Sequence, residues 1–481
     1  MMYDVAVIGA GVVGALTARE LRRRGVSVVI LEAGADVAAG ASRANSGIVH
    51  GGFDPLPGTK KAALNVRGTA AMPALCAELG VSYRQNGSLV LAFSEEEMAT
   101  VRALYARGQE NGVPGLSLLD RAAVLSLEPR VSAAVCGALL CSSAGIVCPY
   151  GLTIAAVGNA MDNGADLLTG FCVDRIENAG DHYRVSAKDR AVLARYIVNA
   201  AGLYADRVAA MVGDARYHVV AKKGEYMLLD RTEGGLADHT LFQVPSRVGK
   251  GVLVTPTADG NLLIGPTSVV QEDRECRDTT ADGLAAVRTA AARTMENIPY
   301  RQVITSFTGV RASLAASDDF IIEASPVAPR FVMALGIDSP GLSSAPAIAE
   351  ELLACLAKAG LVLGDNPEFD PHRASYHAFR DMDDSEQAAF LRENPAYGHI
   401  VCRCEGITEG EIIAAIRRNP PARSVDAVKR RVRAGMGRCQ GGFCLSYVTD
   451  ILAREWNTDA GTITKCGPGS ELLVGRTKEG L

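Results

Sequence analysis

Four cysteines near the end of the chain are spaced as two tight pairs, Cys402-x-Cys404 and Cys439-x4-Cys444. Four thiolates are the ligand set of many structural zinc ions and also of iron–sulfur clusters. Structural zinc sites favour two-residue gaps within each pair, and neither pair has such a gap. The spacing therefore favours an iron–sulfur cluster, with a zinc ion and four unligated thiols as the alternatives.

The first part of the chain has the pattern of a dinucleotide-binding unit. The apolar stretch Val5–Ile8 predicts a buried strand, and Gly9-Ala10-Gly11-Val12-Val13-Gly14 predicts a tight turn. An amphipathic helix is expected over Ala15–Arg24, followed by a second buried strand over Val26–Leu31. Strand, glycine-rich turn, helix and strand in this order are typical of a Rossmann-type unit.

Each glycine of this turn has a physical role in binding a dinucleotide. Gly9 makes the turn, Gly11 lets the backbone approach a pyrophosphate, and Gly14 lets the helix pack closely on the strand. The pyrophosphate would rest on the N-terminal amides of the helix, where the helix dipole is positive. Glu32, just after the second strand, is placed to accept hydrogen bonds from ribose hydroxyls and disfavours a 2′-phosphate.

Three later segments indicate which dinucleotide is bound. The loop Gly40–Gly52 is rich in small and hydrogen-bonding residues, which suits a backbone laid against a large planar cofactor. With Ile197–Asp206 and Gly336–Pro346, it resembles the FAD-dependent D-amino-acid oxidase and glycerol-3-phosphate dehydrogenase superfamily. A nicotinamide-only Rossmann domain does not account for the last two segments. The resemblance implies FAD, held by the glycine-rich turn and Glu32 and by the following residues: Ser42, Asn45, Ser46, Gly47, Gly202, Gly336, Gly341, Leu342 and Ser343.

The resemblance also implies an interleaved α/β architecture, in which a Rossmann-like FAD-binding domain alternates along the chain with an antiparallel-sheet substrate domain. A small helical iron–sulfur domain is expected after this body, which covers residues 1–370. The expected FAD-binding pieces are about 1–80, 146–215 and 325–370, the substrate-domain pieces about 81–145 and 216–324, the linker 371–396, the [2Fe-2S]-binding domain 397–455 and the tail 456–481.

Oxidation by a flavin requires a base for the substrate proton and a cation for an acidic group on the substrate. His50 lies in the loop expected beside the flavin, where it acts either as the base or as a hydrogen-bonding partner of the cofactor. Arg311 matches a family position near the substrate, and its guanidinium fork suits a carboxylate or phosphate. The alternative for Arg311 is a surface charge. Lys223, Glu225 and Tyr226 are expected in a strand that roofs the flavin, with Tyr226 directed either at the substrate or into the core.

The substrate is open between several acids. A flavin body joined to a C-terminal cysteine domain resembles the anaerobic and type 2 glycerol-3-phosphate dehydrogenases, which implies oxidation of glycerol 3-phosphate to dihydroxyacetone phosphate. These enzymes usually carry a lysine where this chain has Gly341. The segments Asn45-Ser46-Gly47, Pro57–Ala62 and Lys223–Tyr226 instead resemble the L-2-hydroxyglutarate oxidases. A small L-2-hydroxy acid is therefore the second candidate, and an amino or imino acid the third. A non-substrate alternative is an electron-carrier subunit of a larger complex.

The glycines around both cysteine pairs resemble the bacterioferritin-associated ferredoxin domain, which holds a [2Fe-2S] cluster. This resemblance implies Cys402, Cys404, Cys439 and Cys444 as ligands. The basic stretch Arg417–Arg438 would offset the negative charge of the cluster. Its alternatives are a solvated helix face and a surface for an acidic partner. A cluster that takes electrons from a flavin favours a dehydrogenase over an oxygen-using oxidase.

Composition places the chain among ordinary globular proteins. It has 481 residues, a net charge of −5, 48% hydrophobic and 21% charged residues, which gives no reason to expect nucleic-acid binding. No apolar run is long enough for a transmembrane segment, and the first residues show no secretion signal. We expect a cytoplasmic protein, with peripheral attachment to the membrane through a partner as the alternative. The partners implied are a small anionic substrate and an electron-accepting protein or quinone-linked subunit.

Overall fold

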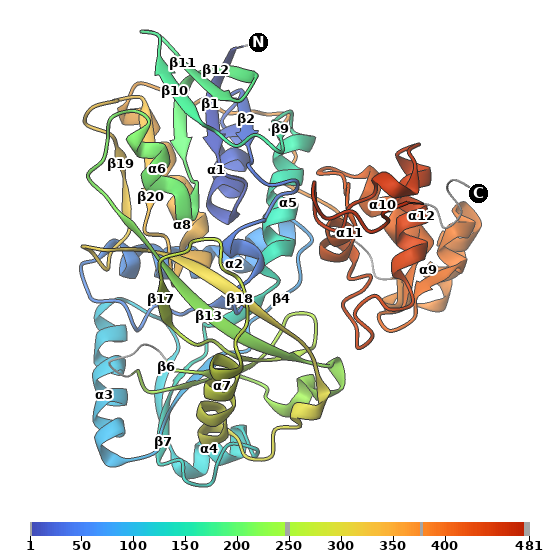
Figure 1. Ribbon diagram of the computed structural model, residues 1–481. Coiled ribbons are helices and arrows are strands. Elements are labelled where there is room, and N and C mark those ends of the chain that lie inside the picture. Colours follow the sequence, from blue (N-terminus) through green and yellow to red (C-terminus); the bar gives the residue numbers. More distant parts are fainter. Residues whose placement is uncertain (1, 246–250, 376–378, 476–481) are drawn as a thin grey trace.

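A parallel-centred sheet forms one half of the body of the protein (Figure 1). The computed structural model describes residues 2–245, 251–375 and 379–475. The strand order is β10-β11-β12-β1-β2-β9, and β20 pairs with both β12 and β19. The strands are β1 (Met2–Ile8), β2 (Val28–Leu31), β9 (Asp166–Leu168), β10 (Arg175–Asn178), β11 (Tyr183–Ala187), β12 (Arg190–Asn199), β19 (Ile321–Ala324) and β20 (Phe331–Leu335).

Helices pack against this sheet around the glycine-rich turn. α1 (Val12–Arg23) contacts both α5 (Pro149–Asp162) and α8 (Gly341–Lys358), and α2 (Lys60–Glu78) packs on α8. The helix α1 begins at Val12, three residues before the expected Ala15, because the second half of the glycine-rich turn is already helical. The short helix α6 (Ala205–Ala210) follows β12.

The second sheet has mainly antiparallel neighbours and forms the other half of the body. Its order is β17-β13-β16-β15-β14-β5-β7-β6, with β18 paired to β13. The strands are β5 (Ser88–Ala92), β6 (Leu116–Asp120), β7 (Gly137–Cys141), β13 (Val219–Leu229), β14 (Thr240–Gln243), β15 (Leu253–Pro256), β16 (Leu262–Gly265), β17 (Val269–Gln271) and β18 (Val303–Leu314). The helices α3 (Glu95–Glu110), α4 (Arg121–Leu127) and α7 (Ala281–Thr294) contact strands of this sheet.

A small three-stranded sheet joins the two halves. β3 (Ile48–Val49) and β4 (Tyr83–Arg84) both pair with β8 (Gly145–Val147). The chain thus passes between the two large sheets several times, as the interleaved α/β class requires. β19 (Ile321–Ala324) already belongs to the first sheet, just before the expected boundary at 325, because it pairs with β20.

The C-terminal region forms a separate helical unit beside α5 (Figure 1). It contains α9 (Asp384–Glu393), β21 (Ile400–Cys402), β22 (Ile407–Thr408), α10 (Glu409–Arg417), α11 (Val425–Val432) and α12 (Leu445–Glu455). α10 begins with a reciprocal capping pair between Thr408 and Glu411, which satisfies otherwise unpaired backbone N–H groups. The expected linker 371–396 includes α9, and its residues 376–378 lie outside the described residues, as do residues 476–481 of the tail.

Short 3₁₀ helices complete the described chain. They are Ala41–Arg43, Gly202–Tyr204, Arg231–Leu236, Tyr300–Gln302, Phe379–Asp381, Pro395–Gly398 and Ala460–Thr462. Within the described ranges, every helix is too short or too polar to cross a membrane.

Candidate functional site

A cavity of about 1930 Å³ takes its walls from both large sheets. This volume exceeds the roughly 300–1,000 Å³ of an ordinary ligand pocket, and so leaves room for a dinucleotide together with a small substrate. Fourteen of the residues singled out from the sequence line it: Gly9, Gly11, Glu32, Ser42, Asn45, Ser46, His50, Gly202, Lys223, Glu225, Tyr226, Arg311, Gly341 and Leu342. Gly14, Gly47, Gly336 and Ser343 are not among the lining residues and shape the surrounding backbone instead.

One end of the cavity is formed by the turn between β1 and α1. Gly9 has a φ of +103°, which strongly favours glycine, and a Cβ on Gly14 would lie 2.0 Å from the Gly9 carbonyl oxygen. The Glu32 carboxylate accepts hydrogen bonds from the Ala10 and Gly34 amides at 2.8 and 2.7 Å. Burial raises the pKa of Glu32, although these two amides oppose the shift. Ser42 Oγ accepts from the Val12 amide at 2.9 Å, so the loop after β2 meets the start of α1.

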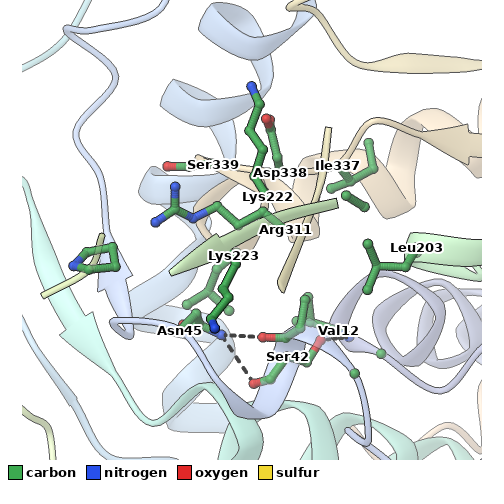
Figure 2. A pocket seen from close by; sticks show the side chains of 18 of the residues that line it. Val12, Ser42, Asn45, Leu203, Lys222, Lys223, Arg311, Ile337, Asp338 and Ser339 are labelled. Carbon is green, nitrogen blue, oxygen red and sulfur yellow. Dashed lines mark hydrogen bonds between the residues drawn. The ribbon is translucent and has the colours of Figure 1, made fainter. Parts of the chain in front are cut away.

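The loop from Ser42 to Gly47 is held in place by its own side chains and by its neighbours. Asn45 Nδ2 donates to the Ala41 and Ser42 carbonyl oxygens at 3.0 and 3.3 Å (Figure 2). Gly47 has a φ of +67°, and a Cβ there would lie 2.5 Å from the Val147 carbonyl oxygen. A Cβ on Gly309 of β18 would lie 1.9 Å from the Ala44 carbonyl oxygen. The backbone approach of loop and strand therefore requires glycine at both places.

His50 presents its ring to the cavity from a firmly held backbone. Its amide donates to Ser343 Oγ at 2.8 Å, and its carbonyl oxygen accepts from Thr69 Oγ1 at 2.6 Å. Its ring lies 5.7 Å from the ring of Phe242. Ser343, in the first turn of α8, thus connects the last glycine-rich segment of the sequence to the loop that carries His50.

The paired strands β13 and β18 divide the candidate catalytic residues between two faces. Lys222 lies directly opposite Arg311 in the register, and Tyr226 opposite Phe307, so these side chains share one face. Tyr226 stacks on Phe307 at 4.8 Å and lies beside the Arg311 guanidinium. Burial raises the pKa of Tyr226, while Arg311 opposes that shift.

Lys223 projects from the opposite face of β13, and Figure 2 shows Lys222 and Lys223 leaving the strand in opposite directions. Lys223 Nζ lies 3.2 Å from Glu225 Oε1, and both side chains are buried. Glu225 in turn accepts from the Thr280 amide at 2.7 Å. Lys223 therefore lines the cavity as the partner of Glu225, which also binds the residue just before α7. Lys223 lies on the opposite face of the strand from the side chains that contact Arg311.

Two functional candidates were missed by the sequence reasoning. Lys222 was passed over in favour of its neighbour Lys223, since the face of a strand cannot be assigned without its pairing partner. Asp338 lies inside a quoted motif, and its Oδ1 is 2.8 Å from Lys61 Nζ. Burial opposes the charge on Lys61, but Asp338 and Asp318 raise its pKa. Strand alternation was the available signal for Lys222, while nothing in the sequence indicated the Lys61–Asp338 pair.

The four cysteines come together in the C-terminal unit as two pairs. Cys402 is hydrogen-bonded to Cys444, and Cys404 to Cys439. Cys402 and Cys444 are buried, whereas Cys404 is exposed. The hydrogen bond from Cys444 lowers the pKa of Cys402 to about 6. Across the described ranges, no three His, Cys, Asp or Glu side chains converge as ligands of one metal ion. Each pair brings two thiols together, and four cysteine thiolates are the ligand set of a [2Fe-2S] cluster.

The basic stretch does not form a solvated helix face. Arg430 and Arg431 of α11 bind Asp36 of the body, and Arg438 lies 3.3 Å from Asp230. Arg417, by contrast, pairs with Glu455 inside the C-terminal unit. Much of the stretch therefore attaches the cysteine-bearing unit to the body of the same chain.

Comparisons with known proteins match both parts of this arrangement. Residues 4–355 match the family of FAD dependent oxidoreductases, and residues 400–454 match the BFD-like [2Fe-2S] binding domain. The chain is 44% identical to a glycerol 3-phosphate dehydrogenase of Caloramator mitchellensis over 99% of each chain. It is 33% identical to the human mitochondrial L-2-hydroxyglutarate dehydrogenase over 57% of this chain and 62% of that protein.

A solved structure shares the fold of the body. Dithionite-reduced L-alpha-glycerophosphate oxidase from Mycoplasma pneumoniae, with FAD bound, aligns with a TM-score of 0.73 and 29% sequence identity. The alignment covers 78% of this chain and 99% of that structure.

Proposed function

Because the chain belongs to the FAD-dependent oxidoreductase family and also carries a BFD-like [2Fe-2S]-binding domain, we propose that it is a glycerol 3-phosphate dehydrogenase that delivers electrons through its cluster. The observation that carries the choice of substrate is the pair Lys222 and Arg311, directly opposite each other on one face of the roof strands. Two cations at one place suit a phosphate dianion. The full-length similarity to a glycerol 3-phosphate dehydrogenase supports the same choice.

The cavity residues fit FAD at its nucleotide end. The turn Gly9–Gly14 offers the N-terminus of α1 to the pyrophosphate, and the Glu32 carboxylate lines the cavity where it could accept hydrogen bonds from the ribose hydroxyls. Ser42, Asn45, Ser46 and Gly47 would hold the next part of the cofactor, and Gly202, Gly336, Gly341, Leu342 and Ser343 the remainder. Bound FAD supplies the hydride acceptor of the reaction.

The side chains around the cavity would position the substrate and move its proton. The Arg311 guanidinium and Lys222 Nζ bind the phosphate, which orients the hydroxylated carbon. An imidazole nitrogen of His50 accepts the hydroxyl proton, because a histidine pKa suits general base work near neutral pH. Tyr226 is kept beside Arg311 by its stacking on Phe307. Lys223 is assigned to holding Glu225 and the start of α7.

The ligands of the [2Fe-2S] cluster in this proposal are Cys402, Cys404, Cys439 and Cys444. The match of residues 400–454 to the BFD-like [2Fe-2S] binding domain supports the assignment over a single zinc ion. Such a cluster passes electrons one at a time to an acceptor, here a partner protein or quinone-linked subunit.

An L-2-hydroxy acid is the second candidate. The guanidinium fork of Arg311 also fits a carboxylate, and the chain is similar to L-2-hydroxyglutarate dehydrogenases. A dicarboxylate would use Lys222 for its second carboxylate.

The deciding experiment is anaerobic bleaching of the bound flavin by a panel of substrates. Glycerol 3-phosphate is expected to bleach it fastest among glycerol 3-phosphate, 2-hydroxyglutarate, lactate, malate, proline and sarcosine. Faster bleaching by 2-hydroxyglutarate would identify the protein as an L-2-hydroxy acid dehydrogenase, the second candidate. If no compound bleached the flavin, the protein would be an electron-carrier subunit instead.

Gly14→Ala is expected to remove most of the bound FAD. The new Cβ would lie 2.0 Å from the Gly9 carbonyl oxygen, which is backbone and cannot move without opening the turn. Such overpacking costs about 1–3 kcal/mol or more. The ratio of flavin to protein absorbance and the melting temperature measure the effect. Gly235→Ala, with no atom within 4 Å of the new Cβ, is the matched control. Equal FAD content in both variants would contradict the assignment.

A further inference from the structure

The cysteine-bearing unit is attached to the nucleotide end of the body by a buried clamp. Arg431 donates two hydrogen bonds of 2.9 Å to the Asp36 carboxylate, and Arg430 donates one of 2.6 Å. The side chain of Arg431 is fully buried. Burial opposes the charge of Asp36, but the two arginines lower the pKa of Asp36 overall.

A second clamp lies next to the cysteines and centres on Arg433, directly after α11. Its Nη1 lies 2.8 Å from Asp259 Oδ2, and its Nη2 donates to Asn261 Oδ1 at 3.0 Å. Its Nε donates to Glu405 Oε2 at 2.9 Å, and Glu405 directly follows Cys404. One guanidinium therefore joins the connection between β15 and β16 of the body to a cysteine-bearing loop.

The two clamps bring α5 of the body close to the cysteines at one contact. Tyr150 Oη, in the first turn of α5, lies 3.5 Å from Met436 Sδ and 3.4 Å from Asp259 Oδ2. Just before α5, the Val147 amide donates to the Gly47 carbonyl oxygen at 2.8 Å, which belongs to the loop along the cavity.

On the other side of this contact, the backbone leads directly to a cysteine. The Gly435 amide, next to Met436, donates to Cys402 Sγ at 3.5 Å. A short series of contacts thus connects the loop at Gly47 with the thiol of Cys402 through Tyr150 and Met436. Arg433 stands beside this series, bound to residues on both sides of it.

We propose that Arg433 is a positioning residue that holds the cluster in one docked place on the body, with the Tyr150–Met436 contact as the entry for electrons from the flavin of the same chain. This inference rests on the proposed function. Oxidation of one hydroxyl releases two electrons and two protons. A [2Fe-2S] cluster held by the four cysteines would accept these electrons one at a time and pass each to a one-electron acceptor, while the protons would leave to solvent.

Arg433→Met tests the docking in the holoprotein, with Arg417→Met as the matched control. Methionine keeps much of the length of the side chain but removes all three interactions. Arg417 is an exposed arginine that pairs with Glu455 inside the C-terminal unit. Hydrogen exchange of the backbone amides at 257–261 and 433–437 should rise in Arg433→Met and stay unchanged in the control. Unchanged exchange in both would overturn the proposal.

The second readout follows electrons from flavin to cluster without any substrate. Light in the presence of EDTA reduces the flavin directly, so the result does not depend on which compound the enzyme oxidises. The rate of cluster reduction should fall about tenfold or more in Arg433→Met, because breaking a buried ion pair lowers the docked population. Flavin and cluster contents should stay at wild-type levels. Equal rates of flavin-to-cluster electron transfer in variant and wild type, or no transfer in wild type, would contradict the proposal.

Asp259→Asn provides a test from the body side, outside the cluster domain. The single change should slow cluster reduction, and in an Arg433→Met background it should add little, because both remove the same contact. Arg433→Lys should recover part of the rate, since it keeps the charge but not the three-way geometry. Fully additive effects would show that the two residues act separately, against the proposal.

Discussion

Cys402→Ser is expected to separate substrate oxidation from electron delivery. Cys402 is buried, contacts Cys444 and accepts a hydrogen bond from the Gly435 amide, so it is the proposed ligand most enclosed by protein. Losing it should remove the cluster and lower acceptor-linked activity by about a hundredfold or more, since outer-shell changes alone cost about 10–100-fold. Anaerobic bleaching of the flavin by substrate should stay within about twofold, because the cavity lies in the body.

Iron and sulfide analysis measures the cluster content, dye reduction measures the acceptor-linked activity, and stopped-flow absorbance measures the bleaching of the flavin. Cys466→Ser is the matched control, because Cys466 is an exposed cysteine in the tail. Full acceptor activity in Cys402→Ser, with peroxide formed at the rate of substrate oxidation, would identify an oxygen-using oxidase with a dispensable C-terminal domain. If Cys402→Ser contained as much iron as wild type and no zinc, the cluster would be held by a different set of ligands.

Arg311→Met is expected to cause the largest loss in substrate oxidation. Its guanidinium stands opposite Lys222 on the cavity face and also holds Tyr226. Hydrogen bonds to charged groups are worth about 1.5–3 kcal/mol each, so a two-point contact with phosphate predicts a fall in kcat/KM of about a hundredfold or more. Lys222→Met, which removes a single point charge, should cost about tenfold.

Steady-state kinetics with glycerol 3-phosphate and with glycerol distinguish binding of the phosphate from general damage. Glycerol lacks the phosphate, so its much lower kcat/KM should change little in Arg311→Met. Arg102→Met, on an exposed arginine of α3, should behave as wild type with both compounds. An equal loss for both compounds would mean that Arg311 supports the fold or the cofactor rather than the phosphate.

The motifs that could be predicted directly from the sequence are those whose residues lie close together along the chain. Gly9, Gly11 and Gly14 share one turn with the start of α1, so their spacing alone indicates nucleotide binding. The two tight cysteine pairs are similar, because each contributes to one loop. The fold class also followed, since the family resemblance carried by three separated motifs implied an interleaved body, which the two sheets show.

The site residues that escaped prediction depend on pairing across the chain. Lys222 and Lys223 differ only by strand alternation, and the register with β18 is what places Lys222 with Arg311. The same applies to Lys61 and Asp338, which lie far apart in sequence and meet at 2.8 Å. The basic stretch was open between charge compensation, a solvated face and a partner surface, and much of it binds carboxylates of the same chain.

The sequence by itself determined that this protein carries a dinucleotide turn, a flavin-type set of motifs and four cysteines in two pairs, because local spacing encodes these features. Only the tertiary structure decided how they are related. It showed which cysteine contacts which, which lysine faces Arg311, and that Arg430, Arg431 and Arg433 fasten the cysteine-bearing unit to the body. The physical reason is that a charge in a sequence has no partner until folding buries it beside one, and only burial makes such a pair a fixed contact.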